Sequence, residues 1–245
     1  MDRKNIPNPG FADDDGTADP ALARALERWS QDRAVEPEVL AALLPSRLIV
    51  PIVALLGEVE TDGNGLRHEK TSDMAVPVIE AADGRRALPA FTSLESLARW
   101  RADARPAPVA APQAVLTAYS ERADTLLVDP AGPVAYQLTG ARMRAVAELR
   151  AYLPPARDPE VREAVRQVLA GEPVVAAGYL RSGGGADGTL ALVLDPDTAD
   201  TEVRAVADRL VAALVADPVL RVRLDRGLEL ALLRTGLPQE PFYRR

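Results

Sequence analysis

The sequence contains no cysteine and only one histidine, His68, and these scarcities exclude several kinds of site. Without cysteine the chain can form no disulfide and offers no thiol nucleophile. A zinc ion would have to be bound by histidine, aspartate and glutamate alone, and one histidine makes a structural zinc site a poor expectation. We therefore expect neither a metal nor another cofactor.

Long apolar runs are also missing. No stretch of about eighteen consecutive apolar residues occurs, which is the minimum for a membrane-spanning helix. The first twenty residues carry Asp13, Asp14 and Asp15 where a signal peptide would have its apolar core. The sequence predicts a cytoplasmic protein that neither spans a membrane nor carries a signal peptide.

Lysine is scarce as well, occurring only at Lys4 and Lys70, and the formal net charge is −7. General affinity for nucleic-acid phosphates comes from clustered lysine and arginine side chains. In this chain the arginines are interspersed with acidic residues, so nucleic acid is not an expected partner.

What the chain has is length and apolar content: 245 residues, 47% of them hydrophobic, which favours one large or two small domains. Pro154 and Pro155 prevent a helix from continuing and mark the best boundary. We expect a flexible arm over residues 1–17, a first domain over residues 18–153 and a second over residues 158–245. The predicted fold class is α+β, with a mixed or antiparallel sheet packed against helices in each domain.

In the first domain, Asp19 and Pro20 are typical of a helix start, and Leu22, Leu26 and Trp29 follow at helical spacing. Proline residues at 106, 108 and 112 are expected to break the chain. The other expected elements are helices over residues 37–44, 113–122 and 140–152 and strands over residues 47–56, 75–80, 85–90, 124–128 and 134–138.

The segment over residues 88–100 joins a strand to an amphipathic helix. Asp83 and Gly84 form a turn signal before it, which predicts a hairpin. Ser93 is placed to cap the helix, and Leu94, Leu97 and Trp100 share one face. We expect that face to be buried.

In the second domain, a helix over residues 158–170 is expected to be capped by Asp158. A glycine-rich loop over residues 182–188 separates strands predicted over residues 174–180 and 190–194. The remaining expected elements are a helix over residues 201–216 and strands over residues 219–224 and 228–233.

These motifs carry a resemblance to a known family. The Asp83-Gly84 turn, the run Leu88-Pro89-Ala90-Phe91-Thr92-Ser93 and the helix ending at Trp100 resemble the N-terminal domain of the SseB family, in its actinobacterial form. The likeness extends to residues 11–16, 69–77 and 241–243. It implies an SseB N-terminal domain followed by an SseB C-terminal domain and brings no established catalytic residue. Some members are associated by name with type III secretion, from which no needle or translocon role follows.

The sequence offers little catalytic chemistry. The loop over residues 183–188 leads into a predicted strand, whereas a phosphate-binding P-loop leads into a helix. Asp195 and Asp197 lack the spacing of a calcium loop, and Asp197 or Thr198 is expected to serve the start of a helix. No nucleophile-elbow pattern surrounds a serine. No catalytic residue is predicted.

One mixed-charge group contains the histidine: His68, Glu69, Lys70 and Asp73 lie where a loop enters a strand. Histidine titrates near neutral pH and lysine can bind an anion, so the group suits a ligand contact or acid–base chemistry. The alternative is a solvated strand entrance, of which such a group is also typical. We predict a binding or adaptor protein whose unknown protein partner contacts these four residues, with an enzyme using the same group as the alternative and homo-oligomerisation left open.

Overall fold

The computed structural model describes residues 11, 14–55, 59–61, 67–69, 73–183 and 186–245, with only the backbone described for residues 55, 59–61, 67–69 and 73. The chain divides into two compact units, Met1–Tyr152 (unit 1) and Leu153–Arg245 (unit 2). Both combine helices with mixed or antiparallel sheets, so the predicted α+β class is confirmed. The exact limits of the two family domains stay a prediction.

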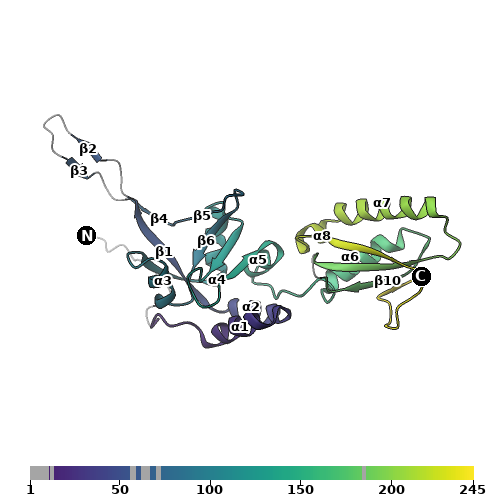
Figure 1. Cartoon of the computed structure of the whole chain (residues 1–245), viewed down its shortest axis with the longest axis horizontal. Helices are drawn as coiled ribbons and strands as arrows, with labels where there is room; N and C mark the ends of the chain where they lie inside the picture. The colour runs from purple at the N-terminus through teal and green to yellow at the C-terminus, as the bar shows by residue number, and fades with distance from the viewer. Residues whose placement is uncertain (1–10, 12–13, 56–58, 62–66, 70–72, 184–185) are drawn as a thin grey trace, which may run out of the picture. The chain divides into compact units, whose positions relative to one another are not determined.

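Unit 1 contains a two-stranded sheet, β2-β3, and two larger sheets that meet at one point (Figure 1). One has the strand order β5-β6-β8-β9 and the other β4-β1-β7, and an isolated bridge between Ile49 and Phe91 connects them. Within the first sheet β6 and β8 are parallel, while the other pairings in both sheets are antiparallel. The strands of unit 1 are β1 (Arg47–Leu55), β2 (Val59–Thr61), β3 (Arg67–Glu69), β4 (Asp73–Ala75), β5 (Ile79–Glu80), β6 (Arg86–Ala90), β7 (Arg105–Ala110), β8 (Thr125–Val128) and β9 (Tyr136–Thr139).

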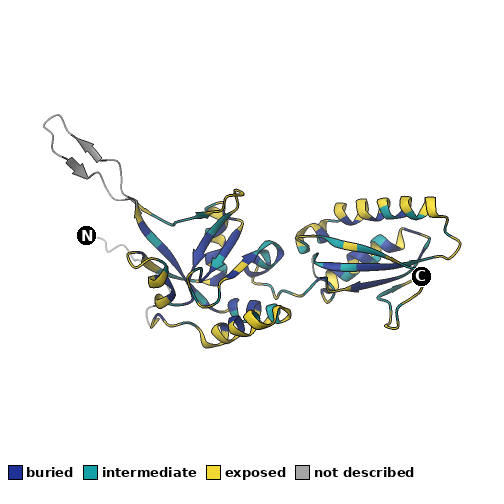
Figure 2. Ribbon diagram, in the orientation of Figure 1, coloured by how far each residue is buried: buried dark blue, intermediate teal, exposed yellow. Residues whose placement is uncertain are grey.

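The helices of unit 1 cover these sheets and supply much of its core (Figure 2). Apolar side chains of α1, α2, α4 and α5 pack with the buried strand residues, and the Trp29 and Tyr136 rings meet edge to face with 4.9 Å between their centroids. The helices are α1 (Pro20–Gln31), the short 3-10 helix η1 (Arg33–Val35), α2 (Glu36–Leu43), α3 (Leu94–Trp100), α4 (Ala111–Ser120) and α5 (Gly140–Ala147).

Strand β7 was not predicted from the sequence, because Pro106 and Pro108 read as chain breaks. In the structure both prolines pair with β1, Pro106 opposite Pro51 and Pro108 opposite Ile49. The backbone N–H and C=O of Ile49 point away from Pro108 and form hydrogen bonds with Phe91 on the other side of β1. In an antiparallel ladder, alternate residue pairs exchange no hydrogen bonds. Pro106 and Pro108 occupy such pairs, so β1 requires no N–H from either proline.

Other predictions in this region need correction. The strand expected over residues 75–80 is divided, because β4 pairs with β1 while β5 pairs with β6, and Pro77 lies between them. Gly84 does form the expected turn, with a φ of +83°. Helix α5 ends at Ala147 rather than near residue 152, and Leu149 has a φ of +55°.

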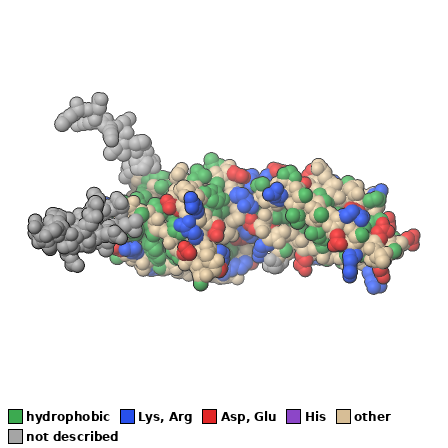
Figure 3. Space-filling view, turned by 90° about the horizontal axis from the view of Figure 1, so that it is seen from above, with side chains coloured by type: hydrophobic (Ala, Val, Ile, Leu, Met, Phe, Trp, Pro, Cys, Tyr) green, Lys and Arg blue, Asp and Glu red, His purple; other side chains and the backbone are tan. Residues whose placement is uncertain are grey.

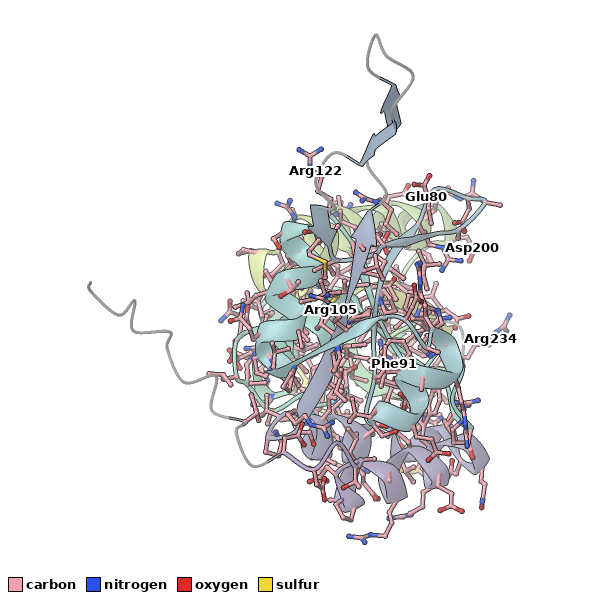
Figure 4. All side chains as sticks on the ribbon, turned by 90° about the vertical axis from the view of Figure 1, so that its left-hand side faces the viewer. Glu80, Phe91, Arg105, Arg122, Asp200 and Arg234 are labelled. Carbon is pink, nitrogen blue, oxygen red and sulfur yellow. The ribbon has the colours of Figure 1, made fainter. Side chains whose placement is uncertain are left out.

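The predicted capping of α3 is confirmed, but its buried face is narrower than expected. The Ser93 hydroxyl accepts a hydrogen bond from the backbone N–H of Ser96. Leu97 is buried and Trp100 is partly buried against Phe91, whereas Leu94 is 43% exposed. Phe91 itself lies in the interior of unit 1 (Figure 4).

The N-terminal arm expected over residues 1–17 lies largely outside the described residues. Its described end contacts the domain: Asp14 forms an ion pair with Arg47 at 2.8 Å, and the Gly16 carbonyl accepts from the Leu94 N–H. The Arg47 guanidinium lowers the pKa of the Asp14 carboxyl. Residues 14–17 are thereby held against β1 and α3.

Unit 2 packs three helices on a four-stranded sheet with the order β12-β11-β10-β13. Strands β11 and β12 are parallel, and the glycine-rich loop joins β10 to β11 as predicted. Residues 219–224, predicted as a strand, belong instead to helix α8 and the residue after it. The elements are α6 (Pro159–Ala170), β10 (Val175–Arg181), β11 (Gly188–Leu194), α7 (Asp200–Ala216), α8 (Pro218–Arg223), β12 (Leu228–Leu233) and β13 (Tyr243–Arg244).

Ion pairs of Asp158 and Glu172 connect elements of unit 2. Asp158 caps α6, as predicted, and its other oxygen accepts from Arg223 of α8 at 3.0 Å. Glu172 accepts two hydrogen bonds from Arg209 of α7, and this contact lowers the pKa of the Glu172 carboxyl. Because the Asp158–Arg223 pair is nearly buried, it fixes the position of α8 against α6.

Candidate functional site

The residues predicted as a partner-binding group are only partly described. His68 and Glu69 belong to β3, where their backbones pair with Glu60 and Val59 of β2. Asp73 is the first residue of β4, and Lys70 lies outside the described residues. Because none of their side chains is described, this group stays a prediction.

Two aspartates, Asp195 and Asp197, follow β11. The described part of the chain contains no group of three or more histidine, cysteine, aspartate or glutamate residues that could hold a metal ion. The expectation that Asp197 or Thr198 caps the next helix is wrong, because Ala199 occupies the cap position of α7 without a side-chain hydrogen bond.

A pocket in unit 1 lies beyond the carboxyl ends of the parallel strands β6 and β8. Thr92 follows β6 and Asp129 follows β8, so the parallel pairing brings these two residues together. Ligands of α/β sheets commonly bind outside the carboxyl ends of parallel strands. The pocket, here called the Asp129 pocket, has a volume of about 430 Å³. Its walls come from α1, α3 and the loops after β6 and β8, and are formed by Ala18, Ala23, Leu26, Glu27, Thr92, Ser93, Glu95, Ser96, Arg99, Asp129, Pro133 and Val134.

Asp129 is the buried polar centre of this pocket, with only 4% of its surface exposed. Its carboxylate accepts hydrogen bonds from the Thr92 backbone N–H at 2.9 Å and the Thr92 hydroxyl at 2.6 Å. Its φ of +49° starts a turn that Gly132 completes, where a Cβ would lie 2.8 Å from that of Asp129. Burial raises the pKa of the Asp129 carboxyl, although hydrogen bonds from Thr92 and Ser96 act in the opposite direction.

The raised pKa predicts a pH-dependent difference in stability between the wild type and Asp129→Asn. The folded protein binds the Asp129 proton more tightly than the unfolded chain, so the contribution of Asp129 to the free energy of unfolding is complete below the ordinary aspartate pKa. It falls as pH rises through the higher folded-state pKa, and one pKa unit corresponds to about 1.4 kcal/mol.

Denaturant unfolding of both proteins at several pH values above 4 measures this difference. Asparagine does not titrate, while Asp14 and Glu172 titrate in both proteins and cancel in the comparison. The free energy of unfolding of the wild type minus that of Asp129→Asn should fall as pH rises. A value that stayed constant with pH, or increased with it, would contradict the raised pKa of Asp129.

A second concave surface lies at one edge of unit 2. It has a volume of about 260 Å³ and is bounded by α7, α8 and β12. We call it the β12 groove, and its lining is apolar except for one arginine: Val211, Leu214, Val215, Leu220, Arg221, Leu224, Gly227, Leu228 and Leu230.

The β12 groove continues into exposed apolar side chains. Val211 and Val215 of α7 are 48% and 68% exposed, and Leu232 of β12 is 50% exposed. Figure 2 shows α7 exposed along most of its length, and Figure 3 shows hydrophobic side chains between charged ones over this part of the chain. None of the described helices is both long and apolar enough to cross a membrane.

Sequence reasoning found neither pocket. The sequence indicates only that Asp129 lies in a turn after a strand. Thr92 comes close to it because β6 and β8 pair in parallel, and these two strands are distant in sequence. The apolar residues of β12 predicted a strand, but not that the strand would lie at the edge of its sheet. In both cases the missing information was strand order.

Comparison with known families gives one match. The sequence profile described as SseB protein N-terminal domain matches residues 22–145, just over half of the chain. This range contains most of α1, the sheets of unit 1 and every residue of the Asp129 pocket except Ala18. Neither a curated protein nor a solved structure matches the chain.

Proposed function

We propose that this chain, which belongs to the SseB family, is an adaptor that binds a protein partner through the β12 groove of unit 2. The observation that carries the proposal is an apolar groove beside an unpaired sheet edge. Strand β12 pairs with β11 on one side, and no described strand pairs with its other side. Alternate residues of β12 therefore offer backbone hydrogen-bonding groups to an added strand.

The contrast between the two units supports this assignment. The edge strand β7 of unit 1 contains Pro106 and Pro108, which remove backbone donors and discourage strand addition. Strand β12 contains no proline and one charged residue, Glu229. Natural proteins usually block such edges, so a long open apolar edge is typical of an interaction surface.

The charges around the groove indicate the chemistry of the partner. Arg221 lines the groove, and Arg234 follows the last residue of β12. Both arginines are exposed. The occupant we propose is an extended segment of another protein, with apolar side chains at alternate positions to enter the groove and acidic residues to meet these arginines.

Site-specific photo-crosslinking tests the proposal. A photoreactive amino acid at position 215 is expected to capture a protein from an extract of the source cells, whereas the same amino acid at position 116 should not. Leu116 of α4 is 47% exposed and lies in unit 1. Arg221→Glu should reduce capture at position 215 several-fold, because it reverses a charge that the acidic partner meets.

The matched charge control is Arg122→Glu, whose side chain projects from unit 1 (Figure 4) and should leave capture unchanged. Equal capture from positions 215 and 116 would contradict a specific groove. A crosslinked product of twice the chain mass would identify a second copy as the occupant and overturn the proposal of a different protein.

The group His68, Glu69, Lys70 and Asp73 remains a proposed recognition surface, supported by its mixed charges and its family-like sequence. The same photoreactive amino acid at position 70 compares it directly with the β12 groove. Capture from position 70 alone would assign partner binding to this group. An enzymatic function for these residues is the alternative, and no contact among the described residues favours it.

A further inference from the structure

The charges around the Asp129 pocket do not balance. Three carboxylates line it, those of Asp129, Glu27 and Glu95, with the single guanidinium of Arg99. Arg99 pairs with Glu95, four residues before it on α3. Within the described residues, neither Asp129 nor Glu27 forms an ion pair with a cationic side chain, so the pocket as a whole carries excess negative charge.

The hydrogen bonds of Asp129 do not remove this imbalance. Its two donors, the backbone N–H and the hydroxyl of Thr92, are neutral, and so is the Ser96 hydroxyl, which also lowers the pKa of Asp129. A carboxylate has about four lone-pair sites, so these neutral groups leave room for a further donor. Burial still raises the pKa of Asp129, so the neutral donors compensate only part of the desolvation of its charged form. A bound cation would compensate the rest.

The apolar walls of the pocket define the other half of a ligand. Ala23 and Leu26 come from α1, and Pro133 and Val134 from the loop after β8. These side chains suit an aliphatic stem, while the buried Asp129 and the exposed Glu27 suit a positive head group. Each oxygen of the Asp129 carboxylate already accepts a hydrogen bond from Thr92, so the pair is not free for the planar fork of a guanidinium, but it can still accept one N–H of an ammonium.

We infer that the Asp129 pocket binds a primary alkylammonium group, its nitrogen donating to the Asp129 carboxylate and its aliphatic stem lying against Leu26 and Val134. The group could be supplied by a lysine side chain of a peptide or by a free aliphatic amine. This site is in unit 1 and does not depend on the function proposed for the β12 groove.

Calorimetric titration of the full chain with n-butylammonium tests the inference, with n-butanol as the neutral control of similar size. Saturable binding in the millimolar range or tighter is expected for the ammonium and not for the alcohol. Asp129→Asn should weaken ammonium binding about tenfold or more, since a hydrogen bond to a charged group is lost. Circular dichroism of Asp129→Asn is the control that checks whether this variant is folded.

A second pair of variants does not depend on the buried aspartate. Ala23 and Ala21 are both exposed on α1, but only Ala23 lines the pocket. Ala23→Trp should fill the pocket and abolish binding, whereas Ala21→Trp should bind n-butylammonium like the wild type. Both substitutions are at exposed helix positions, so both proteins are expected to fold.

A third titration, with N-acetyl-lysine amide, distinguishes the two sources. Binding at least as tight as that of n-butylammonium would indicate a lysine side chain, and binding of the free amine alone would indicate a small amine. Either result supports the ammonium site. The inference is overturned if n-butylammonium shows no saturable binding, if n-butanol binds equally well, if Asp129→Asn binds n-butylammonium as tightly as the wild type, or if binding survives in Ala23→Trp.

Discussion

Replacing Phe91 by alanine is expected to lower the free energy of unfolding by about 3–5 kcal/mol, the usual range for truncating a buried aromatic side chain. Phe91 is fully buried, its ring centroid lies 5.4 Å from that of Trp100, and it packs with Leu97. It also provides the backbone bridge to Ile49 that connects the two larger sheets of unit 1. Alanine keeps this bridge but leaves a cavity where the sheets meet.

Denaturant unfolding followed by far-ultraviolet circular dichroism measures the effect. Leu94→Ala is the matched control, because Leu94 is three residues away and 43% exposed, and it should cost less than about 1 kcal/mol. If the two variants lost similar stability, the junction between the sheets would not be the tightly packed region that the structure describes.

Asp158→Ala should destabilise the protein by about 3 kcal/mol or more. Asp158 caps α6 through the backbone N–H groups of Glu160 and Val161, and removing such a cap costs about 0.5–2 kcal/mol. The substitution also removes the buried one of the two carboxylates that pair with Arg223, whose side chain is 14% exposed, and the exposed Glu160 compensates this charge only in part, which adds to the loss.

Glu160→Gln provides the comparison, because Glu160 contacts the same guanidinium at 2.6 Å from an exposed position. We expect this variant to lose less than about 1 kcal/mol in the same unfolding experiment. Equal losses would mean that Asp158 acts only as another surface charge. An intermediate Asp158→Asn variant, which can still cap α6, would separate the cap from the ion pair.

Local sequence signals predicted the helix starts well. Asp19, Ser93 and Asp158 were each expected to cap a helix, and each accepts a hydrogen bond from the first turn. These predictions succeeded because a cap and its donors lie within three residues of one another. The turn at Gly84 succeeded for the same reason, since its positive φ suits glycine regardless of the rest of the fold.

Predictions failed where a distant partner decided the outcome. Pro106 and Pro108 predicted a break in the chain, yet both belong to a strand. They lie opposite residues of β1 with which they exchange no backbone hydrogen bond, so the missing proline N–H is not needed there. The apolar residues of 219–224 predicted a strand, yet they form α8, where Asp217 caps the helix and Arg223 meets Asp158. Short apolar runs do not distinguish helix from strand, so tertiary contacts settled the choice.

The sequence by itself determined the α+β class, the capped helices and the exclusion of cysteine chemistry, because these follow from composition and from interactions within a few residues. Only the tertiary structure brought Thr92 to Asp129 and placed β12 at an open edge beside α7. Both features depend on the order of strands in a sheet, and strand order is set by packing between segments that lie far apart in the chain.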